Sequence, residues 1–119
     1  MTGSGGNDLM LGSDLVDTID GVGGDDCIVA GDAADTITAG LGNDIVFAGG
    51  GSDIANGEGG DDTVHGEEGD DTLDGETGDD TLEGGPGDDS HDGGADTDVC
   101  TGGGQPGDTF DASCETQNP

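Results

Sequence analysis

Residues 57–83 read GEGGDDTVH, GEEGDDTLD and GETGDDTLE, three consecutive versions of one nine-residue unit. The sixth residue of each unit is aspartate, and aspartate recurs every nine residues in both directions along the chain, at eleven positions in all. A short period held over this length is typical of a solenoid, in which each repeat packs on its neighbours. The every-ninth aspartates are Asp8, Asp17, Asp26, Asp35, Asp44, Asp53, Asp62, Asp71, Asp80, Asp89 and Asp98.

Two further columns appear when each unit is numbered from position 1 to position 9, with this aspartate at position 6. Position 4 is glycine in eight of the eleven units, which indicates a backbone with positive φ or a close approach of two chain segments. Position 8 is apolar or small in ten of eleven units and is the expected core. That column consists of Met10, Ile19, Ile28, Ile37, Val46, Ala55, Val64, Leu73, Leu82, His91 and Cys100.

Each unit therefore predicts a six-residue turn followed by a three-residue strand whose middle residue points inward. Such strands, about 10 Å long, are too short to stand alone, so the units must stack. The sequence predicts an all-β fold, a parallel β-roll solenoid with two nonapeptides, 18 residues, per turn and about five and a half turns in residues 1–101. Residues 102–119 break the period and are expected to form an irregular C-terminal cap.

The charge of the chain limits what it can bind. Lys and Arg are absent, and 30 Asp and Glu give a formal net charge of -30. Nucleic acids and anionic membrane surfaces are therefore excluded as direct partners, and a metal cation is the natural counterion. No stretch of 18 apolar residues is present, so membrane insertion is not expected.

The units resemble the pattern G-G-x-G-x-D-x-U-x, with U a large apolar residue, of the RTX or hemolysin-type calcium-binding repeat. The resemblance extends over residues 3–101 and implies a β-roll with Ca²⁺ ions between stacked turns, up to about nine in all. It implies that position-6 carboxylates and turn carbonyls hold each ion, an all-oxygen environment that suits Ca²⁺. One ion would lie between Asp44 and Asp62, with the carbonyls of Gly40, Gly42, Gly57 and Gly59. Another would lie between Asp53 and Asp71, with those of Gly49, Gly51, Gly66 and Glu68.

Some units depart from this pattern. The second unit has Asp14 at position 3 and Leu15 at position 4, while Ala33 and Asp96 replace the position-4 glycine of two others. Sites that use these turns are expected to be weak, altered or empty. Where two aspartates are adjacent, the first, at position 5, is expected to face mainly solvent.

The cysteines suggest a cross-link at the cap. A disulfide between Cys100 and Cys114 would fit an oxidising compartment, and the alternative is two buried thiols in a reducing one. Cys27 is left over at an outward position, either as a plain thiol or as a link to another molecule.

One group of apolar residues is not explained by the repeat, because it lies at outward positions. The outward positions 7 and 9 of the first, third and fifth units carry Leu9, Leu11, Cys27, Val29, Ile45 and Phe47. An outward apolar patch usually marks an interface, here with a protein partner, a second copy or another domain. The alternative is a chance arrangement.

No catalytic motif is present, and we expect that the chain is not an enzyme. Ser90, His91 and Asp92 are consecutive in an expected strand, so their side chains alternate and cannot form a triad. The expected function is an extracellular calcium-binding module, secreted or on the cell surface, that folds on binding Ca²⁺ and has a structural or interaction role. Alternatives are a calcium-dependent ice-binding or adhesin solenoid, and an accessory module of a secreted enzyme.

Overall fold

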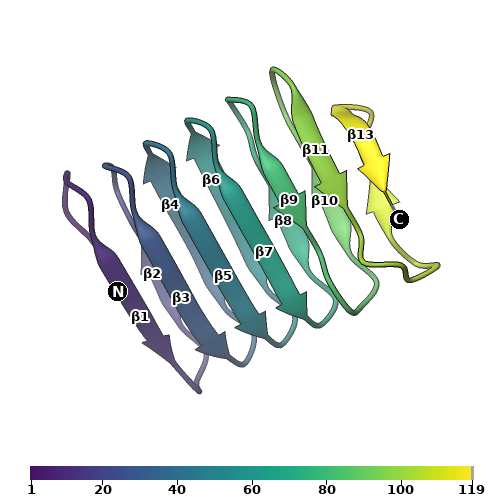
Figure 1. Cartoon of the computed structure of the whole chain (residues 1–119). Coiled ribbons are helices and arrows are strands. Elements are labelled where there is room, and N and C mark those ends of the chain that lie inside the picture. The colour runs from purple at the N-terminus through teal and green to yellow at the C-terminus, as the bar shows by residue number, and fades with distance from the viewer. Residues whose placement is uncertain (119) are drawn as a thin grey trace.

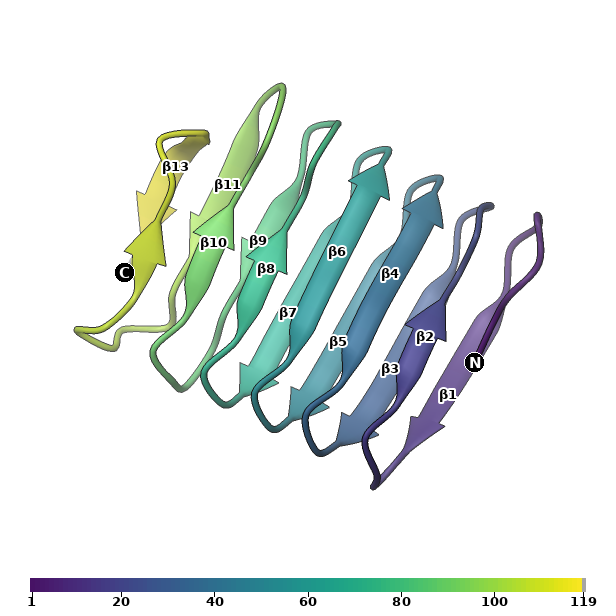
Figure 2. The same ribbon diagram turned by 180° about the vertical axis from the view of Figure 1, so that it is seen from behind.

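A computed structural model describes residues 1–118, which wind into a flattened coil with two parallel β-sheets facing each other (Figures 1 and 2). We call the seven-stranded sheet the odd wall and the six-stranded sheet the even wall. The odd wall contains, in spatial order, β1 (Leu9–Ser13), β3 (Cys27–Asp32), β5 (Ile45–Gly50), β7 (Thr63–Glu68), β9 (Thr81–Glu83), β11 (Asp98–Thr101) and β13 (Cys114–Asn118). The even wall contains β2 (Thr18–Asp20), β4 (Thr36–Leu41), β6 (Ile54–Gly59), β8 (Thr72–Asp74), β10 (Ser90–Asp92) and β12 (Thr109–Phe110).

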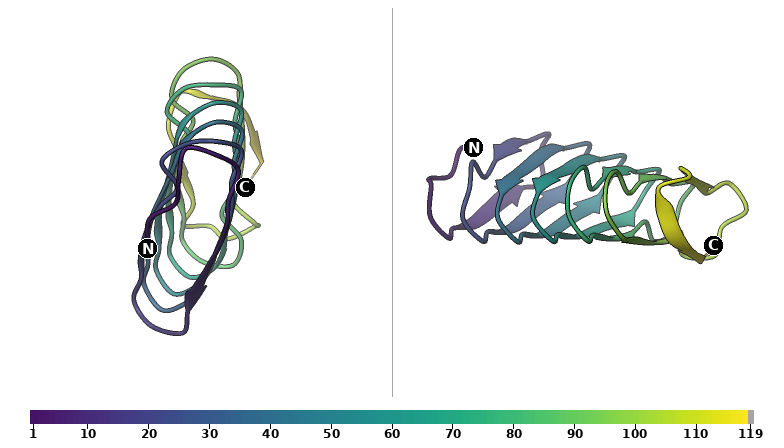
Figure 3. Two further views of the ribbon diagram at one scale, coloured as in Figure 1. Left: turned by 90° about the vertical axis from the view of Figure 1, so that its left-hand side faces the viewer. Right: turned by 90° about the horizontal axis from the view of Figure 1, so that it is seen from above.

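The register of the sheets confirms the predicted coil. Ile28 pairs with Val46 and Val46 pairs with Val64, so neighbouring strands of one wall lie 18 residues apart in sequence. Odd units form one wall and even units the other, and the coils stack directly on one another when seen down the axis (Figure 3). The parallel β-roll predicted from the nonapeptides is therefore the observed fold.

The core is the single layer of side chains enclosed between the walls. Every position-8 residue is buried, from Met10 in β1 to Cys100 in β11. Alanines at position 1 of three units, Ala30, Ala39 and Ala48, are fully buried beside them. The molecule measures 36 × 31 × 13 Å, and its small third dimension reflects a core only one layer deep.

The strands are longer than the sequence predicts in the middle of the roll. The strands β3 to β7 each have six residues and continue into position 3 of the next unit. This happens because the turns themselves stack in register: Gly31 pairs with Gly49, and Gly49 pairs with Glu67. Backbone hydrogen bonds therefore extend around the coil from the walls into its edges.

The turns share one backbone shape from the third unit to the eleventh, with positive φ at positions 2 and 4. A Cβ on Gly60, at position 4, would lie 1.9 Å from the carbonyl oxygen of Gly42 in the preceding coil. Ala33 and Asp96, which replace glycine at this position, also adopt positive φ, 80° and 85°. These two departures from the pattern therefore keep the shape of the turn.

The C-terminal cap is more regular than expected. Residues 102–118 add one strand to each wall, β12 beside β10 and β13 beside β11. The predicted disulfide between Cys100 and Cys114 is present and buried, and it joins β11 to β13. Phe110 of β12 stacks on His91, with ring centroids 4.9 Å apart, and closes the core at this end. No helix with the length and apolarity to cross a bilayer occurs within residues 1–118.

Loss of the disulfide should destabilise the cap. It joins residues 14 apart in sequence, and a closed loop of about 15 residues corresponds to about 3 kcal/mol of unfolded-state entropy. We expect Cys114→Ala to lower the free energy of unfolding of the Ca²⁺-loaded protein by about that amount in urea titrations. Cys27→Ala, which removes the half-buried free thiol, is the matched control and should change stability much less. Equal midpoints for the two variants would contradict the prediction.

Candidate calcium sites

The every-ninth aspartates line the inside of the two edges of the roll. The nine members of this series from Asp26 to Asp98 are only 0–3% exposed. The first two, Asp8 and Asp17, are half-buried. Each aspartate of the series lies just before a strand, or in the case of Asp98 is the first residue of one, where the turn enters the wall. Because units alternate between walls, the aspartates form two rows, one on each edge. We call the edge formed by the turns of the odd-numbered units, with its row, the odd edge and the odd row, and the other the even edge and the even row.

From Asp26 onward, one oxygen of each carboxylate is held by the backbone of the preceding coil. The Oδ1 atom of Asp62 accepts a hydrogen bond from the backbone N–H of Asp44 at 2.8 Å, and that of Asp80 accepts one from Asp62 at 2.7 Å. The same bond recurs along both rows from Asp8 and Asp17 onward. These bonds fix the position and orientation of each of these carboxylates.

From Asp26 onward, the second oxygen of each carboxylate is buried and has no hydrogen-bond partner. This holds for Oδ2 of all nine aspartates from Asp26 to Asp98. A buried anionic oxygen without a partner is strongly unfavourable, and the sequence contains no Lys or Arg to pair with it. The rows therefore require a cation from solution.

The surroundings of Oδ2 fit a hard cation. A Cβ placed on Gly57 would lie 2.4 Å from Oδ2 of Asp62 and 3.0 Å from the carbonyl oxygen of Gly75 in the next coil. The equivalent point at Gly66 lies 2.4 Å from Oδ2 of Asp71 and 2.8 Å from the carbonyl oxygen of Gly84. At these two turns a carboxylate oxygen and a carbonyl oxygen thus face one small space, and alanine occupies the equivalent position at Ala30, Ala39 and Ala48. Oxygen-only surroundings with flexible geometry suit Ca²⁺.

Side chains alone do not complete such a site. Within residues 1–118 no group of three or more His, Cys, Asp or Glu side chains is arranged to hold a metal ion. A metal site here would therefore need turn carbonyls as well, and the resemblance implies those of Gly40, Gly42, Gly49 and Gly51, all of which have positive φ.

Two of the predicted carbonyl ligands already accept hydrogen bonds. The carbonyl oxygen of Gly59 accepts one from the N–H of Gly42, and that of Glu68 accepts one from Gly51, both at 2.8 Å. A carbonyl has two lone pairs, so each retains one for an ion. The complete ligand set remains a prediction.

The buried carboxylates are difficult to ionise without metal. Burial raises the pKa of Asp62 from 3.8 to about 7, despite the hydrogen bond from Asp44, and the charge of Asp44 adds to the increase. Burial likewise raises the pKa of Asp71 and of Asp80 to about 6. The pKa values of Asp44, Asp53, Asp89 and Asp98 are also raised, mainly by burial.

These shifts predict opposite effects of pH on the metal-free and metal-loaded proteins. A raised pKa in the folded state stabilises the metal-free fold below about pH 4, and this contribution is lost as the pH rises toward 7. Calcium binding requires ionised carboxylates, so protons compete with Ca²⁺ below about pH 7. We expect the calcium affinity to fall at least about tenfold between pH 7.5 and pH 5 in calorimetric titrations. An affinity that is constant over this interval would contradict the prediction.

Two carboxylates that the nine-residue count does not predict extend the rows into the cap. Oδ1 of Asp108 accepts a hydrogen bond from the N–H of Asp89 at 3.1 Å, and its Oδ2 is buried without a partner. Oε2 of Glu115 accepts a bond from the N–H of Asp98 at 2.6 Å. The sequence signal for Asp108 was Gly107-Asp108-Thr109, which repeats the pattern one residue out of register.

A second ladder, at position 5, runs along the outside of the odd edge. Oδ1 of Asp25 accepts a hydrogen bond from the N–H of Asn43, and Oδ1 of Asn43 accepts one from the N–H of Asp61, at 3.0 and 3.1 Å. The ladder extends from Asn7 to Thr97. The position-5 side chains are exposed, as expected, but they also bind the backbone of the next coil.

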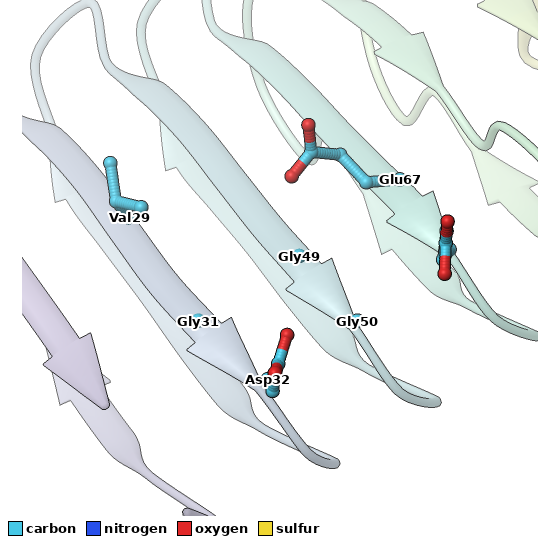
Figure 4. Close-up of a pocket in the computed structure, with 7 residues that line it drawn as sticks. Val29, Gly31, Asp32, Gly49, Gly50 and Glu67 are labelled. Carbon is cyan, nitrogen blue, oxygen red and sulfur yellow. The ribbon is translucent and has the colours of Figure 1, made fainter. Parts of the chain in front are cut away.

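The predicted apolar patch lies on the outer face of the odd wall. Leu9 is 68% exposed and Ile45 is 44% exposed, while Phe47 is half-buried because it stacks on His65. A groove lined by Val29 and by the bare backbone of three glycines adjoins the patch, with Asp32 and Glu67 beside it (Figure 4). The apolar surface therefore ends at carboxylates on this side.

Comparison with protein families agrees with the geometry. The model of the RTX calcium-binding nonapeptide repeat, which spans four copies, matches residues 2–37, 11–46, 20–55, 47–82, 56–90 and 74–106. No curated protein and no solved structure matches the chain. The overlapping matches cover the whole roll, where the buried carboxylates form two rows inside stacked glycine-rich turns. The chain belongs to the family of RTX calcium-binding nonapeptide-repeat proteins.

Proposed function

We propose that this chain is an extracellular module that folds as it binds several Ca²⁺ ions and then serves as a rigid structural or interaction element. The observation that carries the proposal is the unbroken series of buried Oδ2 atoms without partners. A row of this kind cannot form at neutral pH without cations, so folding and metal binding become one equilibrium.

The position-6 aspartates would hold the ions together with turn carbonyls of both coils. In the middle of the odd edge these are Asp44 and Asp62 with Gly40, Gly42, Gly57 and Gly59. In the middle of the even edge they are Asp53 and Asp71 with Gly49, Gly51, Gly66 and Glu68. Bound Ca²⁺ supplies the positive charge that offsets repulsion of roughly 3 kcal/mol between two carboxylates about 5 Å apart.

The disulfide supports the extracellular assignment. Structural disulfides form and persist in oxidising compartments, and Cys100 and Cys114 are joined and buried. Extracellular calcium modules typically bind with dissociation constants of about 0.1–1 mM, so a chain of this kind stays unfolded until it reaches the exterior.

A titration of folding with buffered Ca²⁺ tests this proposal. We expect half of the β-sheet signal in far-UV circular dichroism to appear at about 0.1–1 mM free Ca²⁺. A midpoint below about 1 μM would contradict the extracellular assignment, because the chain would then fold at intracellular concentrations. No response to Ca²⁺ would contradict the function as a whole.

The apolar patch on the odd wall supports the interaction role. Leu9, Leu11, Val29 and Ile45 are exposed and adjacent through the register of β1, β3 and β5, and Phe47 extends the patch. We propose that a second copy of the chain covers this patch, since a face without charges suits a symmetric contact.

Charging the patch tests this interaction. In sedimentation experiments with Ca²⁺ we expect the wild type to dimerise and the double variant Ile45→Glu/Phe47→Glu to be monomeric. The double variant Thr63→Glu/Thr81→Glu places the same charges further along the same wall and should still dimerise. A wild type that remains monomeric at high concentration would contradict self-association.

One observation bears on the ice-binding alternative. The register aligns Thr18, Thr36, Ile54 and Thr72 with Ser90 and Thr109 on the outer face of the even wall. This row of hydroxyls is longer than the sequence analysis counted. Ile54 interrupts it, however, and the exposed Asp20 and Asp92 lie beside it. We therefore favour the calcium-dependent structural role, and inhibition of ice recrystallisation by the folded protein would reverse this preference.

A further inference from the structure

The first aspartate of each row differs from all the later ones. Oδ2 of Asp8 accepts hydrogen bonds from the N–H and the hydroxyl of Ser4, at 2.7 and 2.8 Å. Oδ2 of Asp17 accepts the same pair from Ser13, at 2.8 and 2.9 Å. From Asp26 to Asp98 the corresponding oxygen has no partner. The two N-terminal carboxylates are therefore satisfied by the protein itself.

The backbone of these two turns also differs from that of the others. Units three to eleven have positive φ at positions 2 and 4, but Ser4 and Ser13 at position 2 do not, nor do Gly6 and Leu15 at position 4. Gly6 could adopt positive φ at little cost, so the residue type does not prevent it. Instead, the hydroxyls of Ser4 and Ser13 accept bonds from the N–H groups of Gly6 and Leu15 at 3.3 Å, which holds each turn in its own shape.

The serines occur only where a row begins. Position 2 of the later units is occupied by Val22, Gly31, Gly40, Gly49, Glu58, Glu67, Glu76, Gly85 and Gly94. Each edge thus has one serine at position 2, in the first turn of that edge.

We propose that Ser4 and Ser13 terminate the two calcium rows at the N-terminal end. Their N–H and hydroxyl groups take the place of Ca²⁺ on Asp8 and Asp17, so the first ions lie between Asp26 and Asp44 on one edge and between Asp35 and Asp53 on the other. This inference rests on the proposed calcium function. It lowers the number of sites between position-6 aspartates from nine to seven.

Counting bound ions by native mass spectrometry tests this assignment. Asp8→Asn is expected to bind as many Ca²⁺ ions as the wild type, whereas the matched variant Asp26→Asn should bind at least one fewer. Loss of an ion in Asp8→Asn would overturn the proposal. If neither variant loses an ion, the aspartate rows do not bind Ca²⁺, and the proposed function fails instead. Circular dichroism in Ca²⁺ establishes that each variant folds.

A gain of binding provides the second test. Ser4→Gly gives the first unit the complete G-G-x-G-x-D pattern and removes the hydroxyl, so we expect one additional ion. Ser4→Ala also removes the hydroxyl, and Val22 and Glu58 adopt positive φ at the same position of their units, so it should gain the ion as well. An unchanged ion count in Ser4→Gly would show that Ser4 does not exclude the ion.

Discussion

Removal of Ca²⁺ by an excess of chelator is expected to unfold the chain, with its radius of gyration rising from 12.7 Å to about 35 Å. Without cations the buried rows contain only carboxylates, and their mutual repulsion adds to the cost of burying each one. Leu, Ile, Val and Phe number only 19 of 119 residues, so the one-layer core offers little compensation.

Small-angle X-ray scattering at pH 7.5 measures this expansion, and circular dichroism reports the loss of the sheets. Mg²⁺ at the same concentration is the control. It prefers a tighter octahedral geometry and releases water reluctantly, so it should not restore the compact form. A compact, β-rich protein in chelator would contradict the prediction and the coupling of folding to metal binding.

Asp62→Asn is expected to have the largest effect of any single substitution in the rows. Asparagine keeps the shape and an oxygen that can accept the hydrogen bond from Asp44, so the change removes mainly the charge beside the predicted ions. Breaking a buried ionic arrangement by removing one partner typically costs about 3–5 kcal/mol. We expect a loss of that size in the Ca²⁺-loaded state, measured by urea unfolding, together with a higher Ca²⁺ concentration for folding.

The neighbouring residue offers a matched control. Asp61 is exposed on the outer ladder, where Asn43 already occupies the equivalent position one coil earlier. Asp61→Asn should therefore change the free energy of unfolding by less than about 0.5 kcal/mol. A comparable loss in both variants would indicate a general effect of charge and contradict a specific role for Asp62.

Much of the fold was predictable from the sequence because the repeat is strict. A period of nine with one inward residue per unit allows few arrangements, and pairing units into coils of 18 residues aligns every aspartate, turn and core position with its counterpart. The position-8 column, the division into two walls and the two rows of aspartates were all predicted correctly on this basis. The disulfide between Cys100 and Cys114, predicted as a cross-link at the cap, is also present.

Other features depend on which atoms face one another in space. The one-residue insertion that brings Asp108 into the even row is invisible to a count in steps of nine. Ala33 and Asp96 looked like defects, yet stacking against neighbouring coils keeps them in the conformation of glycine. The first unit looked regular because Gly6 is in place, although Ser4 gives its turn a different shape.

The sequence by itself determined the period, the inward column and the need for a cation, because these follow from residue type and spacing along the chain. Only the tertiary structure decided that, from Asp26 to Asp98, one oxygen of each aspartate binds the preceding coil while the other is left without a partner. It also decided that Ser4 and Ser13 satisfy that second oxygen at the N-terminal end. The physical reason is that hydrogen bonds between coils depend on distances and directions across 18 residues, which no local pattern contains.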